Sequence, residues 1–300
     1  MLKIAYDKIY SHPLPEGHRF PMIKYELIPE QLLREGLITS ENLFSPQQVD
    51  EKSILLTHDK LYWERLRDLR LSAQEERRTG FPLTRQLIDR EMRIVQGTID
   101  GCMFALESGI SFNTAGGTHH AGTNWGEGFC LLNDQAIAAN YLLKKDFSSS
   151  ILIIDLDVHQ GNGTAEIFQN ESRVFTFSMH AEKNFPFRKE NSDLDIGLST
   201  GIEDDEYLNI LSETLPGLFE LTKPDFVFYL AGVDVLATDK LGHLSLSREG
   251  CKERDRIVFQ LCRQYDTPVQ VSMGGGYSEK IYDILEAHCN TFRLAMDLYF

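Results

Sequence analysis

Short apolar runs recur along the chain, and segments with helical periodicity lie between them. The runs are nearly continuous in Val, Ile, Leu and Phe and do not alternate with polar residues, which is typical of strands buried on both faces of a parallel sheet. We expect a strand in each of six runs: "LKIAY" from Leu2, "ISFNTAGG" from Ile110, "SILIIDLDVH" from Ser150, "RVFTFSMH" from Arg173, "DFVFYLAGVD" from Asp225 and "PVQVSMGGGY" from Pro268.

The segments between these runs predict amphipathic helices. The clearest are "TRQLIDREMRIVQGTIDGCMFALESG" from Thr84, "NDQAIAANYLLKKD" from Asn133, "DDEYLNILSETL" from Asp204 and "SREGCKERDRIVFQLCRQY" from Ser247. Asp204 and Asp205 are expected to open one helix, and Ser247 to cap another.

Alternating strands and helices predict an α/β fold with a single doubly wound parallel sheet covered by helices on both faces. No repeat or linker divides the sequence, so residues 1–300 are expected to form one domain. Right-handed crossovers bring the carboxyl ends of the strands to one edge, where ligands bind in such sheets.

The composition limits the classes of ligand that the protein is expected to bind. The net charge is −15 and the pI is near 5.0, which argues against general affinity for nucleic acid or an anionic membrane and is compatible with cationic ligands. The five cysteines are scattered without a CxxC pair, as in reduced cytoplasmic proteins. We expect no signal peptide and no membrane span.

Unusual polar residues follow the apolar runs. Asp155, Asp157 and His159 are spaced i, i+2, i+4, so that in a strand they would share a face, and Asp234 follows another run. An aspartate after a strand is by itself more typical of a helix N-cap. The combination instead favours a metal site made by Asp157, His159 and Asp234 with open positions, as a hydrolytic metal needs.

Glycine-rich segments carry the other candidates. "NTAGGTHHAGTNWGEGFC" places His119 beside His120 on a loop that glycines would let turn both rings into one cavity, although a polar surface turn is the plainer interpretation. "VSMGGGY" ends in Tyr277, which is either a hydrogen-bond donor to a ligand or a turn residue packed on the rim. Neither segment is a complete dinucleotide-binding motif.

Together, "GGTHHAG…GFCLLND", "DLDVHQGNG", "AGVDVLATDKLGHL" and "MGGGY" resemble the histone deacetylase superfamily, which includes acetylpolyamine amidohydrolases and acetoin-utilisation proteins. The motifs run in family order through most of the chain. "TGFPLT", "HQGNG" and the short length look most like the class IV branch and its bacterial relatives. The resemblance implies an arginase-like fold and a zinc-dependent amidohydrolase that removes the acyl group of acyl-lysine by attack of a metal-bound water.

The resemblance also implies a role for each matching residue. One Zn²⁺ per chain would be held by Asp157, His159 and Asp234, His119 and His120 would flank its water, and Tyr277 would polarise the scissile carbonyl. The expected acyl-lysine tunnel is formed by Phe129, Phe185, Gly128, Leu241 and Gly275. A structural K⁺ or Na⁺ site would use Asp155, Asp157, His159, Ser178 and Met179.

The two histidines are not expected to be equivalent. The resemblance pairs His119 with the anionic Asp155, whereas the residue behind His120 is Asn162, where some family members have an aspartate. An anionic neighbour favours imidazolium and a neutral amide does not. We therefore expect a cationic His119 and a neutral His120 that accepts a proton.

Several alternatives stay open. The substrate is acyl-lysine, an acylpolyamine or another small acylated amine, with an acyl chain of unknown length. Fe²⁺ can compete with Zn²⁺ at an Asp₂His site. A two-metal arginase-type ureohydrolase is less favoured. Such a site needs further acidic ligands at the second strand end, whereas Asp234 stands alone there and the next acid, Asp239, comes five residues later. A catalytically silent acyl-lysine reader or scaffold is the alternative from a different class.

Overall fold

A computed structural model describes all residues, 1–300, and contains one eight-stranded sheet in which every pairing is parallel. The strand order is β2-β1-β3-β8-β7-β4-β5-β6. The strands are β1 (Lys3–Ala5), β2 (Leu43–Phe44), β3 (Ile110–Asn113), β4 (Ile151–Asp155), β5 (Val174–Ala181), β6 (Leu194–Leu198), β7 (Phe226–Leu230) and β8 (Val269–Ser272). The predicted single parallel sheet is confirmed.

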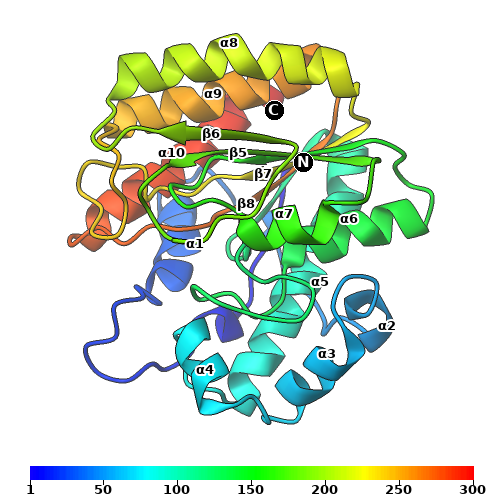
Figure 1. Cartoon of the computed structure of the whole chain (residues 1–300). Coiled ribbons are helices and arrows are strands. Elements are labelled where there is room, and N and C mark those ends of the chain that lie inside the picture. Colours follow the sequence, from blue (N-terminus) through cyan, green and yellow to red (C-terminus); the bar gives the residue numbers. More distant parts are fainter.

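Helices cover both faces of this sheet (Figure 1). One layer contains α1 (Lys24–Arg34), α8 (Asp204–Thr222), α9 (Arg248–Gln264) and α10 (Ile281–Tyr299), and the helices contact one another in the order α8, α9, α10, α1. The other layer is built on α5 (Arg85–Ser108), α6 (Asp134–Lys144) and α7 (Asn162–Phe168). The smaller helices are η1 (Lys8–Tyr10), η2 (Ser40–Asn42), α2 (Glu51–Ile54), α3 (Lys60–Arg67) and α4 (Ala73–Thr79).

Successive strand residues belong to two separate cores, which explains the continuous apolar runs. In β4, Leu152 and Ile154 pack in the core beneath α8 to α10, while Ile151 and Ile153 pack in the core on the α5 side. A strand with a core on each face has no solvent-facing position for a polar residue.

All six predicted strands and four predicted helices are present. Ser247 caps α9 as expected, because its hydroxyl accepts a hydrogen bond from the Gly250 amide at 2.9 Å. Two edge strands were not predicted. In β6 ("LDIGL"), half-buried and exposed positions alternate up to the buried Leu198, and β2 has only two residues, so neither forms an apolar run.

The candidate residues follow the strands at the carboxyl edge, but one local expectation is wrong. β4 ends at Asp155, so Asp157 and His159 lie in the bend after it and not on one face of a strand. The bend also turns the chain into α7, which begins at Asn162. Convergence of these side chains therefore depends on loop geometry and not on strand pleating.

No helix in the structure is long and apolar enough to cross a membrane. All five cysteines are free and buried.

Candidate metal centre and its surroundings

Three side chains converge where the β4 and β7 ends meet. Asp157, His159 and Asp234 each offer a ligand atom, and these atoms all lie within 4.8 Å of one another. β4 pairs directly with β7, which brings the loops that follow the two strands together. All three side chains are buried, and Asp234 has no exposed surface.

The donor set fits a divalent cation. Asp234 Oδ2 is buried and forms no well-aligned hydrogen bond, although His159 Nδ1 lies 3.2 Å away, and such burial is costly for a carboxylate unless a cation is bound. Glycines leave room for the carboxylates, because a Cβ at Gly275 would collide with Asp234 and one at Gly232 with Asp157. The Gly275 amide, one of the expected tunnel groups, donates to Asp157 Oδ2 at 2.9 Å. Two carboxylates and one imidazole are ligands that Zn²⁺ and Fe²⁺ both accept.

The negative charge of the two buried carboxylates also favours binding of a cation at this centre. Burial raises the pKa of Asp234 to about 7, and the neighbouring Asp157 adds to this rise. Burial alone would lower the pKa of His159, but Asp157 and Asp234 outweigh it and raise the pKa to about 10. Without a metal, the two carboxylates therefore hold a proton on the imidazole.

His119 and His120 lie beside this centre with their ring centroids 4.0 Å apart. His119 Nδ1 lies 2.7 Å from Asp155 Oδ2, and His120 Nδ1 lies 2.7 Å from Asn162 Oδ1. Burial opposes charge on both rings, but Asp155 and Asp157 raise the pKa of His119. Burial and the charges of His119 and His159 lower that of His120 well below its usual range.

Asn162 is not the end of this hydrogen-bond chain, a point that the sequence did not reveal. Asn162 Nδ2 donates to Glu127 Oε1 at 2.6 Å, and Arg78 Nε donates to Glu127 Oε2 at 2.6 Å. A carboxylate only accepts, so the amide NH₂ of Asn162 faces Glu127 and its oxygen faces His120. His120 must then donate from Nδ1, which leaves Nε2 free to accept a proton.

The histidine loop is fixed from two sides. The buried Asp134, at the start of α6, accepts hydrogen bonds from the Thr118 amide at 2.9 Å and hydroxyl at 2.7 Å. The Gly163 amide at the start of α7 donates to the His119 carbonyl at 2.9 Å. Gly116 and Gly117 have φ of +80° and +73°, a region that favours glycine, so the loop can turn both rings the same way.

Tyr277 is placed by Asp239, another residue whose role was not predicted. Asp239 Oδ2 accepts from the Tyr277 amide at 2.6 Å, and Oδ1 accepts from the Leu241 amide at 2.8 Å. Asp239 is therefore committed to backbone amides and does not form a second metal site with Asp234. Burial, with the nearby Asp234 and Asp157, raises the pKa of Tyr277 well above its usual range, so its hydroxyl stays a donor.

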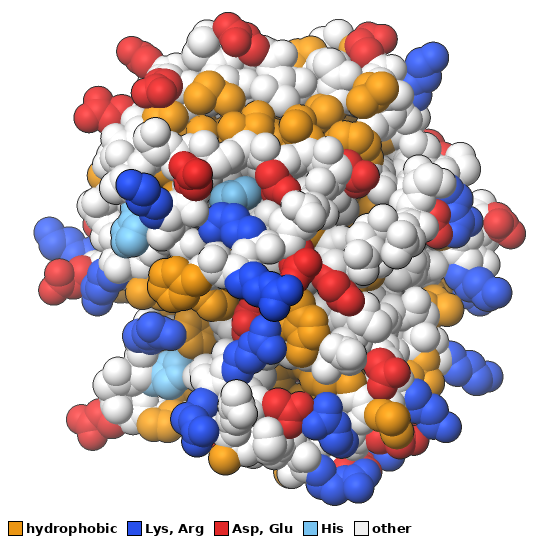
Figure 2. Space-filling model, viewed as in Figure 1, with side chains coloured by type: hydrophobic (Ala, Val, Ile, Leu, Met, Phe, Trp, Pro, Cys, Tyr) orange, Lys and Arg blue, Asp and Glu red, His pale blue; other side chains and the backbone are white.

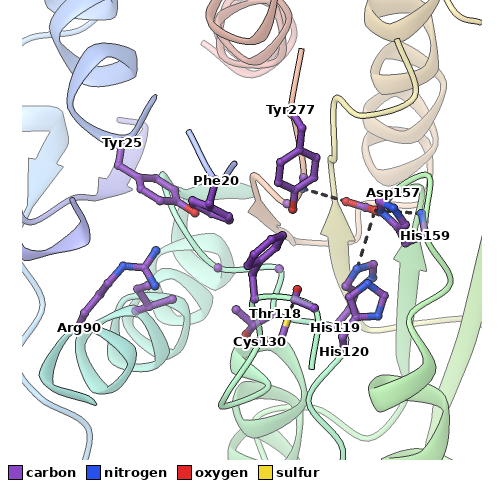
Figure 3. Close-up of a pocket in the computed structure, with 17 residues that line it drawn as sticks. Phe20, Tyr25, Arg90, Thr118, His119, His120, Cys130, Asp157, His159 and Tyr277 are labelled. Atoms are coloured by element: carbon purple, nitrogen blue, oxygen red, sulfur yellow. Dashed lines mark hydrogen bonds and ion pairs between the residues drawn. The ribbon is translucent and has the colours of Figure 1, made fainter. Parts of the chain in front are cut away.

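A cavity of about 40 Å³ lies among Tyr277, Asp157, His159 and the histidine pair (Figure 3). Its far end is lined by Tyr25 and Arg90. An outer cavity of about 340 Å³ opens from it towards solvent. The outer cavity is lined by Phe129, Phe185, Gly128, Leu241 and Tyr277, so four of the five expected tunnel residues meet there. Gly275 instead lines the inner cavity.

The residues expected at a monovalent cation are also neighbours. Ser178 on β5 is the register partner of Asp155 on β4, and Met179 follows it. The Ser178 hydroxyl lies 2.9 Å from His180 Nδ1. The cation site itself stays a prediction.

Comparisons with known proteins agree with this architecture. The histone deacetylase domain family matches residues 18–292. An uncharacterized protein from Picosynechococcus sp. is 44% identical over 99% of both chains. Histone deacetylase 2 of Arabidopsis thaliana is 29% identical, over 87% of this chain and 70% of that protein. The acetoin utilization protein AcuC of Staphylococcus aureus is 28% identical, over 91% of this chain and 77% of that protein.

Solved structures share the fold. An HDAC homologue complexed with SAHA superposes with a TM-score of 0.83 at 25% identity, covering 98% of this chain and 83% of that chain. An HDAC homologue from Aquifex aeolicus has a TM-score of 0.81 at 24% identity, covering 97% of this chain and 82% of that chain. The position within the class IV branch stays a prediction.

Proposed function

Because the chain belongs to the histone deacetylase family, we propose that residues 1–300 form one metal-dependent catalytic domain that hydrolyses the amide of an acylated lysine. The observation that carries the proposal is the convergence of an Asp₂His ligand set, a histidine pair and Tyr277 at the base of a cavity walled by Phe129 and Phe185. This arrangement provides metal ligands, a proton acceptor and a hydrogen-bond donor within one pocket.

A divalent cation held by Asp157, His159 and Asp234 would polarise the acyl carbonyl and lower the pKa of a water molecule. His120 accepts the proton of the attacking water at Nε2 and returns it to the leaving amine. Asn162 supports this role by fixing the tautomer of His120. His119, paired with Asp155, contributes positive charge.

Tyr277 stabilises the negative charge that develops on the carbonyl oxygen. Loss of one such donor typically costs about 3 kcal/mol in activation free energy. Tyr277→Phe should therefore lower kcat by about two to three orders of magnitude on an acyl-lysine peptide, while metal content, measured by elemental analysis, stays unchanged. Full activity of this variant would refute the assignment.

Two single substitutions distinguish the roles of the two histidines. His120→Ala should reduce kcat more than His119→Ala, because only His120 is expected to carry the proton. A pH–rate series for both variants tests this order, and a larger loss in His119→Ala would reverse the assignment.

Turnover of acetyl-lysine, longer-chain acyl-lysine and acetylpolyamine substrates, with metal analysis of the purified protein, decides the remaining choices. We expect hydrolysis of acyl-lysine and about one Zn²⁺ or Fe²⁺ per chain. Binding of acyl-lysine without hydrolysis by the metal-loaded protein would instead identify a silent reader.

A further inference from the structure

The mouth of the outer cavity has the opposite charge to the molecule as a whole. Its lining includes Arg19, Arg78 and Lys183 but no Asp or Glu, although the chain has a net charge of −15. Figure 2 shows Lys and Arg side chains beside an apolar patch in the middle of one face, with Asp and Glu side chains near them and along the upper edge, over α8. Net acidity is therefore a poor guide to the ligand at this mouth.

Two of these cations have no anionic partner. No carboxylate lies within ion-pair distance of Arg19 or Lys183, whereas Arg78 is bound to Glu127. Arg19 is exposed, and its guanidinium carbon lies 5.2 Å from the ring centroid of Phe129. Lys183 is exposed and precedes Phe185 by two residues. Unpaired positive charge thus stands beside both aromatic walls.

We propose that this rim, defined by Arg19 and Lys183, binds a carboxylate carried by the acyl-amine substrate, an inference that rests on the proposed function. The carboxylate is either an acidic residue next to the acylated lysine or the α-carboxylate of a free N-acyl amino acid. An arginine fork and an ammonium are both matched to carboxylate oxygens. An acylpolyamine would bring further positive charge to the same place and is disfavoured.

A matched peptide series tests the charge preference. Acetyl-lysine peptides flanked by Asp, Asn or Lys are compared at low ionic strength, and kcat and KM are measured separately. We expect kcat/KM to be about tenfold higher for the acidic than for the basic peptide, mainly through KM, and to converge at high salt. Equal values for the three peptides would overturn the proposal.

Charge removal assigns the effect to the rim. In the Arg19→Gln/Lys183→Gln double variant the acidic-to-basic ratio should fall close to one. Lys52→Gln removes an exposed cation on α2, outside both cavities, and should keep the ratio. A double variant that keeps the full preference would show that other groups cause it.

Two further measurements separate the outcomes. Free Nε-acetyl-lysine is compared with its C-terminal amide, because a preference for the free acid assigns the carboxylate to the amino acid itself and a preference limited to peptides assigns it to flanking residues. Equilibrium binding of the same peptides is measured alongside turnover. Hydrolysis without charge preference overturns the rim alone, and rim-dependent binding without hydrolysis overturns only the proposed deacylation.

Discussion

Glu127 determines which end of the Asn162 amide faces His120. The neutral Asn162 amide lies 2.7 Å from His120 Nδ1 through its oxygen, and its NH₂ group donates to the Glu127 carboxylate at 2.6 Å. Glu127 does not touch the reacting atoms and acts as a positioning residue. Its function is to prevent the Asn162 amide from presenting its NH₂ group to His120.

An exchange of donor and acceptor tests this positioning. Glu127→Gln and Asn162→Asp alone should each lower kcat about tenfold, because the first loses the anionic acceptor and the second places two carboxylates together. The Glu127→Gln/Asn162→Asp double variant restores one donor and one acceptor and should recover to within about threefold of the original kcat. If both single variants keep full activity with an unchanged pH profile, Glu127 has no positioning role.

Lys24 is a second buried charge close to the centre. It has no exposed surface, and its Nζ donates to the Gly274 carbonyl at 2.9 Å. Burial lowers its pKa to about 8, although Asp234 and Asp157 oppose this. The unfolded chain therefore binds more protons than the folded one between pH 8 and 10.5, so this group makes stability rise with pH in that window.

Lys24→Met should stabilise the protein at neutral pH, because it removes a charge that is costly to bury. We expect the free energy of unfolding at pH 7 to rise by about 2 kcal/mol, after allowing for the lost hydrogen bond. The gain should shrink as the pH rises from 8 towards 10.5. Urea unfolding at several pH values measures this, and a loss of stability at pH 7 would contradict it.

Sequence revealed the residues that stand in local motifs and not those that act through tertiary contacts. The local pattern predicts the site residues that follow apolar runs or lie between glycines, namely Asp157, His159, His120 and Tyr277. Glu127 lies in the same glycine-rich segment, but its partners come from α4 and α7. No spacing rule connects it to them.

At the scale of elements, α9 joins the two loops that carry the ligands. Arg254 and Asp255 on α9 are completely buried. Arg254 donates to the Leu156 carbonyl at 3.1 Å and the Gly232 carbonyl at 2.6 Å, and it pairs with Asp255 at 2.8 Å. These carbonyls lie just after β4 and β7, so one side chain on a helix fixes the separation of Asp157 and Asp234.

Arg254→Met should destabilise the protein by about 3–5 kcal/mol, because it removes the only cation paired with the buried Asp255 and leaves two buried carbonyls without their donor. Asp255 keeps hydrogen bonds from the Tyr229 and Thr291 hydroxyls. Arg256→Met, on the same helix but in a half-exposed pair with Glu253, should change stability by less than about 1 kcal/mol. Denaturant unfolding of both variants gives the comparison. A similar small effect for Arg254→Met would mean that α9 does not fix the ligand loops.

The hydrophobic pattern predicted the central strands of the sheet but not its edge strands or the full length of α8. β4 and β7 have a core on each face, so their apolar runs are continuous. β6 is an edge strand with alternating exposure. α8 extends beyond the expected segment to Thr222 and contains Pro216, which local rules disfavour inside a helix.

At the scale of the whole molecule, the metal centre links proton binding to stability. At pH 7 the metal-free centre holds a proton on His159, whose pKa is about 10, and part of a second on Asp234, whose pKa is about 7. A bound cation needs the neutral imidazole and both carboxylates, so its binding must release these protons.

Zn²⁺ titration of the metal-free protein at pH 7 should therefore release between one and two protons per chain. Calorimetry in buffers of different ionisation enthalpy measures this number. The same titration should raise the free energy of unfolding by about 2.7 kcal/mol when free Zn²⁺ reaches a hundred times its Kd. Binding heats that are independent of the buffer would contradict a protonated His159 in the metal-free centre.

The burial of every cysteine has a practical consequence for studying the mouth. Burial raises the pKa of all five thiols, so the reactive thiolate is scarce as well as inaccessible. Phe187, by contrast, is 91% exposed beside Phe185. Phe187→Cys would therefore create the one readily labelled position without removal of any native cysteine. A fluorophore or spin label attached there would report directly on ligands arriving at the rim.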